Sequence, residues 1–554
     1  MTETAVGTAT TTAPPTELSE PPALSGPIAR ILSRVEGRHL LLSPVNLIGL
    51  ALVALAALGW LRVPVQDLRA RSMDMVFHAF PLAAGALLAA NLATLRSRRH
   101  RTDELFNSLP AAPEARTGAH LLSALWPAAV TCAFFAIMIG AAASMDSFGR
   151  PDGAELLVGP LLVAGAAALG VMVARWVPTP AAAPVTLVAI AAIQVPVSGT
   201  SIVDRGWRRL GFWTYPGDLV PELLPPRLAR WHVVYLVGLV AMAAVGALLV
   251  HGLRRPVVVA GTVAIAVVVT AAWFQTRPLS SEGWAARNAF IERPQDHQVC
   301  EDRSGIRYCA YPAYTGLIDV WAGQAQAVLR AVPPGQWPVG ADVRQGVAAS
   351  DRYWIDDSVL ARELPALPRK GADTVDAGRI QPPMMWEADG SSDLGFALSV
   401  AALIVGLPVG PVEAGTRCSA AGQGRAVIAL WLAAQASVEA AELLGEVAAG
   451  QRSASHVVGA PDWTMPGGVA WGAAEVTQAL RLLERPSDEV RAKVLAGWPG
   501  LTAANVSTAE VSAHLGLPQP PATSASTDIY RGEGRFRVDD GLRLGSACPR
   551  SGRA

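Results

Sequence analysis

The sequence predicts a mainly α protein, in which a polytopic helical membrane domain of about seven transmembrane helices precedes a mainly helical soluble domain with minor β structure. Two observations predict this division. Seven apolar segments lie between Pro44 and Phe274, and each is long enough to cross a bilayer, since about 20 apolar residues in a helix span a hydrocarbon core of about 30 Å. The chain after Phe274 carries more charge and is punctuated by proline and glycine, as in a soluble domain.

The chain before the first apolar segment divides in two. Residues 1–26 are polar and rich in Thr and Pro, and they lack a basic stretch followed by a short apolar one. This composition predicts a disordered N-terminal tail and not a signal peptide. Residues 27–43 are expected to form an interfacial amphipathic helix, because one helical face collects Ile28, Ile31, Leu32, Val35 and His39. The alternative is that this helix continues the first span.

The transmembrane domain is expected over residues 44–274. Its predicted spans cover approximately residues 44–62, 73–95, 119–143, 155–176, 182–199, 230–250 and 256–274. Because a backbone inside lipid must satisfy its own hydrogen bonds, each span is expected to be helical. Asp74, His78 and His232 stand near the starts of spans, where they either serve transport or lie among the headgroups.

The arginines indicate an orientation. They gather before the first span, after the second, after the fourth and between the sixth and seventh, and all four positions fall on one side of the bilayer. The positive-inside rule makes that side cytoplasmic, although Arg62, Arg69 and Arg71 lie in the opposite loop. Together with a composition typical of GC-rich bacterial genomes, this predicts a multi-pass protein of the bacterial cell membrane. Its N-terminus is expected to be cytoplasmic and its C-terminal domain extracytoplasmic.

The cysteines give an independent indication of the compartment. Four of the five cysteines follow the last predicted span, and disulfides persist in oxidising surroundings. Cys300 and Cys309 flank the turn residues 302–305, which predicts a β-hairpin with a bridge across it. Cys418 and Cys548 then pair by elimination. The alternative is a set of free buried thiols.

The connection after the second span contains a charged helix. Thr102 is a suitable N-cap for a short helix that begins Asp103-Glu104-Leu105, and Pro110, directly after Leu109, ends it. Such a helix, held at the membrane surface between two spans, can transmit the motion of a cytosolic partner to both.

Two stretches carry a resemblance to a known family. EGRHLLLSPVNLIGLALVAL, from Glu36, is similar to the interfacial helix and first span of ABC-2 type transporter permeases, the membrane subunits of ABC exporter-like transporters, here of an actinobacterial type. TDELFNSLPAAPEARTGAHLLSAL, from Thr102, resembles their coupling-helix region. The resemblance covers about residues 27–250 and rests on short motifs and topology.

The resemblance implies a homo- or heterodimeric permease driven by a separate ATP-binding subunit. That subunit would dock on the segment 102–113, with Thr102, Asp103, Glu104, Leu105, Leu109 and Pro110 as the ATPase-coupling residues. The chain departs from the family in its seventh span, which leads to a large outside domain. It contains no G-x-x-x-x-G-K-[ST] phosphate loop, so the ATPase must be another chain.

The second half is expected to comprise an extracytoplasmic domain over 275–506 and an irregular C-terminal tail over 507–554. Helices are expected over 314–332, 396–407, 425–449 and 469–485, with a further helix capped by Ser487. CAYPAY, from Cys309, faintly resembles permeases fused to a zinc-aminopeptidase-like domain. Such a domain needs H-E-x-x-H, whereas the histidines of this half are isolated from one another. We therefore expect no enzyme, with no catalytic, cofactor-binding or metal residues.

Two functions remain open. The first is a transport component in the lipid bilayer that works with a cytosolic ATPase and moves an apolar or amphiphilic cargo, because the spans contain no central proton relay. The second is a membrane-anchored extracytoplasmic binding domain, degenerate and peptidase-like, without transport activity. The net charge of zero gives no indication of a nucleic-acid partner.

Overall fold

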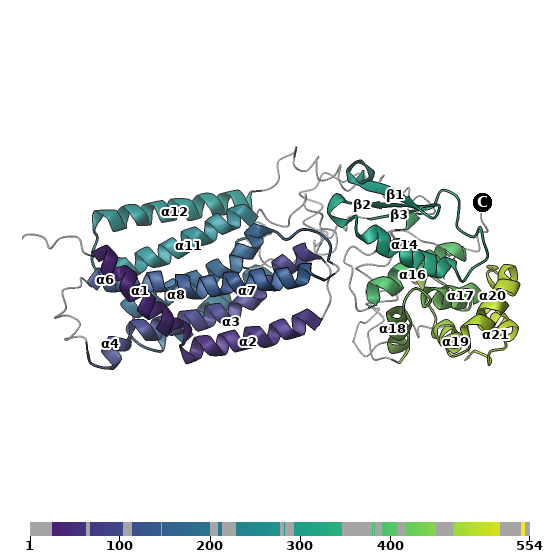
Figure 1. Ribbon diagram of the computed structural model, residues 1–554, viewed down its shortest axis with the longest axis horizontal. Helices are drawn as coiled ribbons and strands as arrows, with labels where there is room; N and C mark the ends of the chain where they lie inside the picture. Colours follow the sequence, from purple (N-terminus) through teal and green to yellow (C-terminus); the bar gives the residue numbers. More distant parts are fainter. Residues whose placement is uncertain are drawn as a thin grey trace, which may run out of the picture.

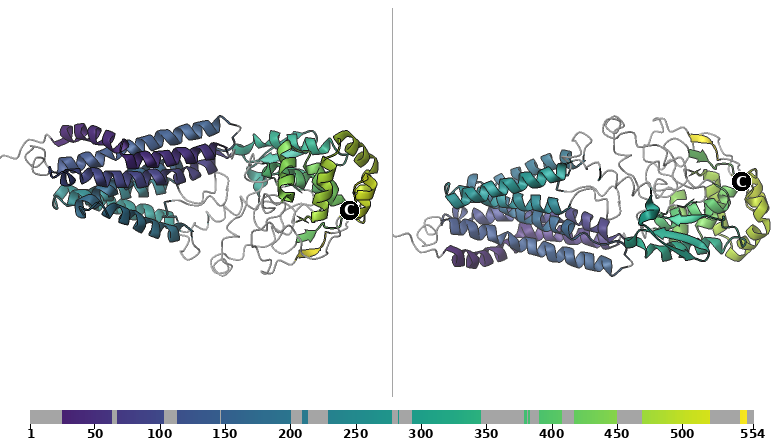
Figure 2. Two further views of the ribbon diagram at one scale, coloured as in Figure 1. Left: turned by 90° about the horizontal axis from the view of Figure 1, so that it is seen from below. Right: turned by 90° about the horizontal axis from the view of Figure 1, so that it is seen from above.

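The structure, a computed structural model, has two parts at opposite ends of an elongated molecule (Figure 1). It describes residues 25–62, 67–102, 113–145, 147–199, 209–212, 229–277, 282, 293–345, 379–380, 382, 390–407, 417–449, 469–520 and 544–548. One part is a helical bundle built from the first half of the chain, and the other is a smaller α/β domain built from the second half (Figures 1 and 2).

The bundle consists of long apolar helices that run along the long axis of the molecule (Figure 1). Its helices are α1 (Ser25–Leu41), α2 (Pro44–Arg62), α3 (Leu68–Thr94), α4 (Arg96–Arg99), α6 (Pro113–Ser123), α7 (Leu125–Ala143), α8 (Gly153–Trp176), α9 (Ala182–Gly199), α11 (Ala229–Leu249) and α12 (Arg255–Thr276). Each predicted span lies within one helix or extends at most one residue beyond it, except that the span 119–143 covers the end of α6 and all of α7, and the mainly α character of this half is confirmed.

Fewer helices qualify as spans than the seven expected. Among the described residues, five are long and apolar enough to cross a membrane, or six if α1 and α2 form one span bent by 57°. The five are Arg71–Thr94, Pro113–Ala143, Gly153–Trp176, Ala229–Leu249 and Arg255–Thr276. The predicted span over 182–199 corresponds to α9, whose described apolar stretch, Ala182–Gln194, is shorter.

Small residues let neighbouring helices of the bundle approach closely. A Cβ on Gly49 of α2 would lie 2.7 Å from the carbonyl oxygen of Pro81 in α3, and one on Gly85 of α3 would lie 3.2 Å from the carbonyl oxygen of Val45. Between α3 and α8, Asn91 Nδ2 donates to the Gly170 carbonyl at 3.4 Å. Close packing and interhelical hydrogen bonds are the main attractions between helices in lipid, where burial of apolar side chains gains little.

Large apolar side chains point outward from the bundle. Ile137 of α7 is 70% exposed, Val188 of α9 is 68% exposed and Leu55 of α2 is 66% exposed. A soluble surface rarely carries so many exposed aliphatic groups together. These side chains therefore suit a hydrocarbon environment.

Helix α1 is present as expected, but it packs by a different face. The predicted apolar face is turned outward, with Ile31 64% and Val35 51% exposed. The packed face consists of Ala29, Ser33 and Leu40, which are buried. The apolar face predicted for an interfacial helix is thus free to contact lipid, whereas the contact with the bundle includes the small residues Ala29 and Ser33, as is usual where helices pack in a membrane.

The part built from the second half of the chain, which we call the soluble domain after the prediction from the sequence, begins with a four-stranded sheet. Its order is β1 (Val299–Arg303), β2 (Ile306–Ala310), β3 (Asp342–Arg344), β4 (Arg379–Ile380), with β1 antiparallel to β2 and the other pairs parallel. Ser304 and Gly305 both have positive φ, 52° and 81°. A type I′ turn, which is common in two-residue hairpin loops, requires positive φ at both central residues. The predicted hairpin is therefore confirmed.

Helices cover this sheet and a second, smaller one. They are α14 (Leu317–Leu329), α16 (Ser391–Ile404), α17 (Gly424–Ala433), α18 (Val438–Ala448), α19 (Ala473–Leu483), α20 (Ser487–Leu501) and α21 (Thr508–Leu515). The second sheet is parallel, in the order β6 (Val469–Ala470), β5 (Arg417–Ser419), β7 (Leu544–Ala547). Every residue of α17 is buried, so this helix forms the centre of the domain.

Two local expectations in the second half differ from the structure. Ser487 is the first residue of α20, and Pro486 occupies the cap position. The chain does not become irregular at Ser507, which caps α21 through a reciprocal capping box with Glu510. Val511 and Leu515 of α21 belong to the hydrophobic core, so the folded domain extends beyond the expected boundary at residue 506.

Candidate functional site at the two ends of the bundle

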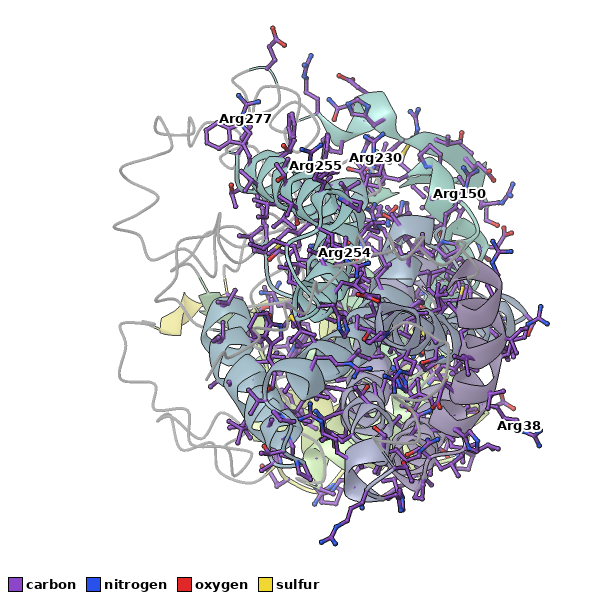
Figure 3. The ribbon with its side chains drawn as sticks, turned by 90° about the vertical axis from the view of Figure 1, so that its left-hand side faces the viewer. Arg38, Arg150, Arg230, Arg254, Arg255 and Arg277 are labelled. Atoms are coloured by element: carbon purple, nitrogen blue, oxygen red, sulfur yellow. A yellow bond between two sulfur atoms is a disulfide. The ribbon has the colours of Figure 1, made fainter. Side chains whose placement is uncertain are left out.

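The connections between the bundle helices gather at two opposite ends (Figures 1 and 2). We call the end that carries α1, α4 and the turn 250–254 the arginine end, and the end that faces the soluble domain the junction end. An ion pair from Arg254 Nη2 to Glu114 Oε1, at 2.5 Å, joins the turn 250–254 to α6 at the arginine end. Figure 3 views the molecule from this end, with Arg38, Arg254 and Arg255 labelled.

Helix α6 is the hub of the polar contacts at the arginine end. Besides Glu114, it supplies Thr117, whose Oγ1 lies 2.8 Å from Nε2 of His251, and His120, whose Nδ1 lies 4.0 Å from Glu36 of α1. Glu36 also forms an ion pair with Arg96 of α4 at 3.6 Å. An ion pair thus joins α4 to α1, and an ion pair and a hydrogen bond join α6 to the turn before α12.

Of the predicted coupling residues, the structure describes Thr102. Its backbone N–H donates to the Ser97 carbonyl at 2.9 Å, and its hydroxyl donates to the same oxygen at 3.3 Å. Arg101, just before it, has a positive φ of 55°, which reverses the chain after α4. Thr102 therefore closes the end of α4. The other predicted coupling residues lie outside the described part of the chain: Asp103, Glu104, Leu105, Leu109 and Pro110.

A polar cavity of about 180 Å³ opens beside this segment. Its lining combines the guanidinium groups of Arg98, Arg116 and Arg175 with the hydroxyls of Thr94 and Ser97. These residues come from the end of α3, from α4, from α6 and from the last turn of α8. The continuous stretch 94–98, Arg116 and the end of α8 therefore build one cationic site.

The positive charge of the cavity arginines helps to lower the pKa of the neighbouring His251. The pKa of His251 is lowered, first by burial and then by the positive charge of Arg175, with smaller effects of Arg116 and Arg254 in the same direction. Glu114 opposes them by raising the pKa. The imidazole is therefore held neutral, and its contact with Thr117 is a neutral hydrogen bond.

The junction end is fastened to the soluble domain by two hydrogen bonds. The Tyr314 hydroxyl donates to Asp67 Oδ2 at 3.0 Å, and the Gly149 N–H donates to the Ala313 carbonyl at 2.9 Å. The Leu68 N–H donates to the Phe148 carbonyl at 2.8 Å and joins the two bundle loops to each other. Since Asp67 and Tyr314 are 3% and 4% exposed, the first bond is shielded from water and correspondingly strong.

Of the ionisable groups predicted near the starts of spans, both histidines are buried and Asp74 is half-buried. His232 of α11 is fully buried, and its Nδ1 lies 2.8 Å from Oε1 of Gln275 in α12. His78 of α3 is buried as well, and Asp74 lies one turn before it. His232 therefore joins α11 to α12 in the protein interior.

The cysteines follow the predicted pattern in part. Cys300 and Cys309 are opposed in the hairpin register and form a disulfide, as predicted. Cys548 is disulfide-bonded, and strand β5, which contains Cys418, pairs with strand β7 directly before Cys548. The side chain of Cys418 lies outside the described residues, so the pairing of Cys418 with Cys548 stays a prediction. Cys132 is a free, exposed thiol.

The sequence did not predict the arginine cluster at the arginine end or the Asp67–Tyr314 contact at the junction end. Arg98, Arg116 and Arg175 served as markers of orientation only, although their common side of the membrane already indicated that they could meet. Nothing in the sequence pointed from Asp67 to Tyr314, which are 247 positions apart. No group of three or more His, Cys, Asp or Glu that could hold a metal ion occurs in the described ranges.

Comparisons with models of protein families, with curated proteins and with solved structures gave no match. The function must therefore be argued from the bundle, its arginine end and its junction.

Proposed function

We propose that the chain is the membrane-spanning permease subunit of an ABC-type transporter, driven by a separate ATP-binding subunit that docks on the segment 102–113. The cargo is apolar or amphiphilic and is exported, and the chain itself is proposed to have no catalytic role. The main support for the proposal is the position of α4 and α6, the helices before and after this segment. The chain leaves the bundle at α4 and returns at α6, at the end opposite the soluble domain (Figure 1).

The contacts of α4 and α6 support a mechanical role. The Arg96–Glu36 pair links α4 to α1, and the Glu114–Arg254 pair links α6 to the start of α12. Each pair is partly exposed and contributes at most about 1 kcal/mol. Such weak links can exchange partners as the helices shift, so a push on the segment between α4 and α6 reaches α1 and α12 without unfolding the bundle.

The orientation in the proposal follows from the arginines. Seven passages of the chain, with α9 counted as a passage, bring the soluble domain to the side opposite the arginine end. We propose that the arginine end is cytoplasmic in a bacterial cell membrane and that the soluble domain is extracytoplasmic. The disulfide between Cys300 and Cys309 suits an oxidising compartment. A dimer of permease subunits, identical or different, completes the proposed transporter.

Charge reversal in the coupling segment tests the proposal. Asp103→Lys with Glu104→Lys should abolish transport and ATP hydrolysis that depends on cargo, because an acidic pair at the proposed docking surface becomes basic. Membrane insertion and thermal stability should stay close to those of the unaltered chain. The measurements are co-purification of an ATP-binding subunit and transport in reconstituted vesicles.

The matched control is Asp488→Lys with Glu489→Lys, the exposed acidic pair that opens α20 in the soluble domain. This control should leave both transport and co-purification unchanged. Transport at the unaltered rate in the Asp103/Glu104 variant would refute the coupling assignment. Failure of any ATP-binding subunit to purify with the unaltered chain would favour a membrane-anchored binding domain.

A further inference from the structure

The cavity at the arginine end has the composition of an anion site. Three arginines, a threonine and a serine are among the residues that line about 180 Å³, whereas a single water needs only about 10–15 Å³. Arg116 and Arg175 are half-buried, and Arg98 lies exposed at the edge. A small tetrahedral anion would thus meet two partly desolvated cations and a third at the opening.

Two carboxylates near the cavity, among the residues that the structure describes, have arginine partners outside its lining. Glu36 forms its ion pair with Arg96, and Glu114 forms its pair with Arg254; neither arginine lines the cavity. The lowered pKa of His251, caused after burial by Arg175, then Arg116 and Arg254, indicates that positive charge prevails here. The cavity therefore favours an anionic ligand over water.

Phosphate matches this donor set better than a carboxylate does. A guanidinium presents five N–H donors in a planar fork, which can bind two oxygens of a phosphate at once. An arginine that already contacts the protein therefore keeps donors for a ligand. The hydroxyl of Ser97 can donate to a remaining phosphate oxygen, whereas that of Thr94 donates to the Ala90 carbonyl at 2.8 Å.

We propose that the cavity between α3, α4, α6 and α8 binds a phosphate group, supplied by the headgroup of an anionic lipid or by free phosphate. Basic pockets between transmembrane helices at the membrane surface bind anionic headgroups in this way. A bound phosphate would bridge α4 and α6, the helices that flank the segment 103–112, to the end of α8. The site does not depend on the proposed docking of an ATP-binding subunit, because its residues come from this chain alone.

Binding is tested on the purified full-length chain by thermal unfolding, followed through tryptophan fluorescence. One arm titrates inorganic phosphate against chloride at equal ionic strength in a non-ionic detergent. The other compares nanodiscs of phosphatidylcholine with nanodiscs that also contain phosphatidylglycerol. A ligand that binds only the folded state raises the unfolding temperature in a saturable manner. A response to phosphate alone identifies the free anion as the ligand, and a response to phosphatidylglycerol alone identifies the headgroup.

The variants are Arg116→Gln and Arg175→Gln, each of which should weaken binding about tenfold, as expected for the loss of one charge-assisted contact. Arg38→Gln is the control, because Arg38 is exposed at the same end and does not line the cavity (Figure 3). Arg116→Lys keeps the charge and should bind more weakly than the unaltered chain but more tightly than Arg116→Gln, which separates lost binding from misfolding. The absence of a saturable shift in both arms, or an equal loss in Arg38→Gln and Arg116→Gln, would overturn the proposal.

Discussion

At the scale of the residue, the chemistry of the bundle depends on which charges meet at its arginine end. His251 shows this most directly, because burial and the nearby Arg175 lower its pKa while Glu114 opposes them. The sequence located His251 in a short basic turn, HGLRRP, but could not show that arginines of α6 and α8 come close to it. That proximity depends on the packing of helices that are far apart in the chain.

The lowered pKa predicts a pH dependence. In the unfolded chain His251 takes up a proton near its ordinary value of 6.5, and in the folded chain it does so only at lower pH. The unfolded state therefore binds more protons between these two values, and stability falls as the pH drops through this window. Nuclear magnetic resonance titration of labelled histidine should give a pKa below 6.5 for His251. Arg175→Gln should raise that pKa, and Arg150→Gln, at an exposed loop of the junction end, should leave it unchanged. An unshifted His251 would contradict the described contact.

At the scale of the element, features that depend on a few neighbouring residues were easier to predict from the sequence than features that depend on the packing of helices. The hairpin over 299–310 was predictable because Ser304-Gly305 is a turn signal that acts within a few residues. Helix α21 was missed although Ser507 and Glu510 have the spacing of a capping box. The packed face of α1 could not be found from apolar periodicity, because that periodicity locates the core of a soluble protein and here marks the outer surface.

The packing of α1 gives a prediction at a single glycine. A Cβ on Gly37 would collide with the indole ring of Trp126 in α7. Gly37→Ala should therefore push α1 away from the bundle and destabilise the protein by about 1–3 kcal/mol, measured as a lower unfolding temperature. Gly118→Ala in α6 is the control, since no atom lies within 4 Å of the added carbon; it should be neutral or stabilising. Equal effects of the two substitutions would show that α1 does not pack as described.

At the scale of the whole molecule, hydrogen bonds join the soluble domain to the bundle. Two halves of different character were predictable from hydropathy, since the apolar segments stop at Phe274. Their contact was not, because it is made by one tyrosine, one aspartate and a short stretch of backbone that carry no pattern of their own. The Tyr314–Asp67 and Ala313–Gly149 bonds connect the domain to the start of α3 and to the loop before α8.

Removal of one hydroxyl tests this attachment. Tyr314→Phe leaves Asp67 buried with one partner fewer, which should cost about 1–3 kcal/mol and should speed amide hydrogen exchange at Gly149. Tyr308→Phe is the matched control: Tyr308 is also buried, but within the described residues its hydroxyl has no hydrogen-bond partner. It should be neutral or stabilising. If amide exchange at Gly149 is equally slow in the unaltered chain, in Tyr314→Phe and in Tyr308→Phe, the Tyr314–Asp67 hydrogen bond does not stabilise the contact between the two domains.

The loop between α7 and α8 has a constraint that most loops lack. Surface connections usually accept extra residues, because their backbone is bonded to water. Here two successive residues are bonded in opposite directions, Phe148 to Leu68 of the bundle and Gly149 to Ala313 of the soluble domain. If one residue were inserted between Phe148 and Gly149, the Leu68–Phe148 and Gly149–Ala313 hydrogen bonds could not both form. The number of residues in this loop is therefore set by the distance between the two domains, and the loop is a poor choice for a tag or a domain insertion.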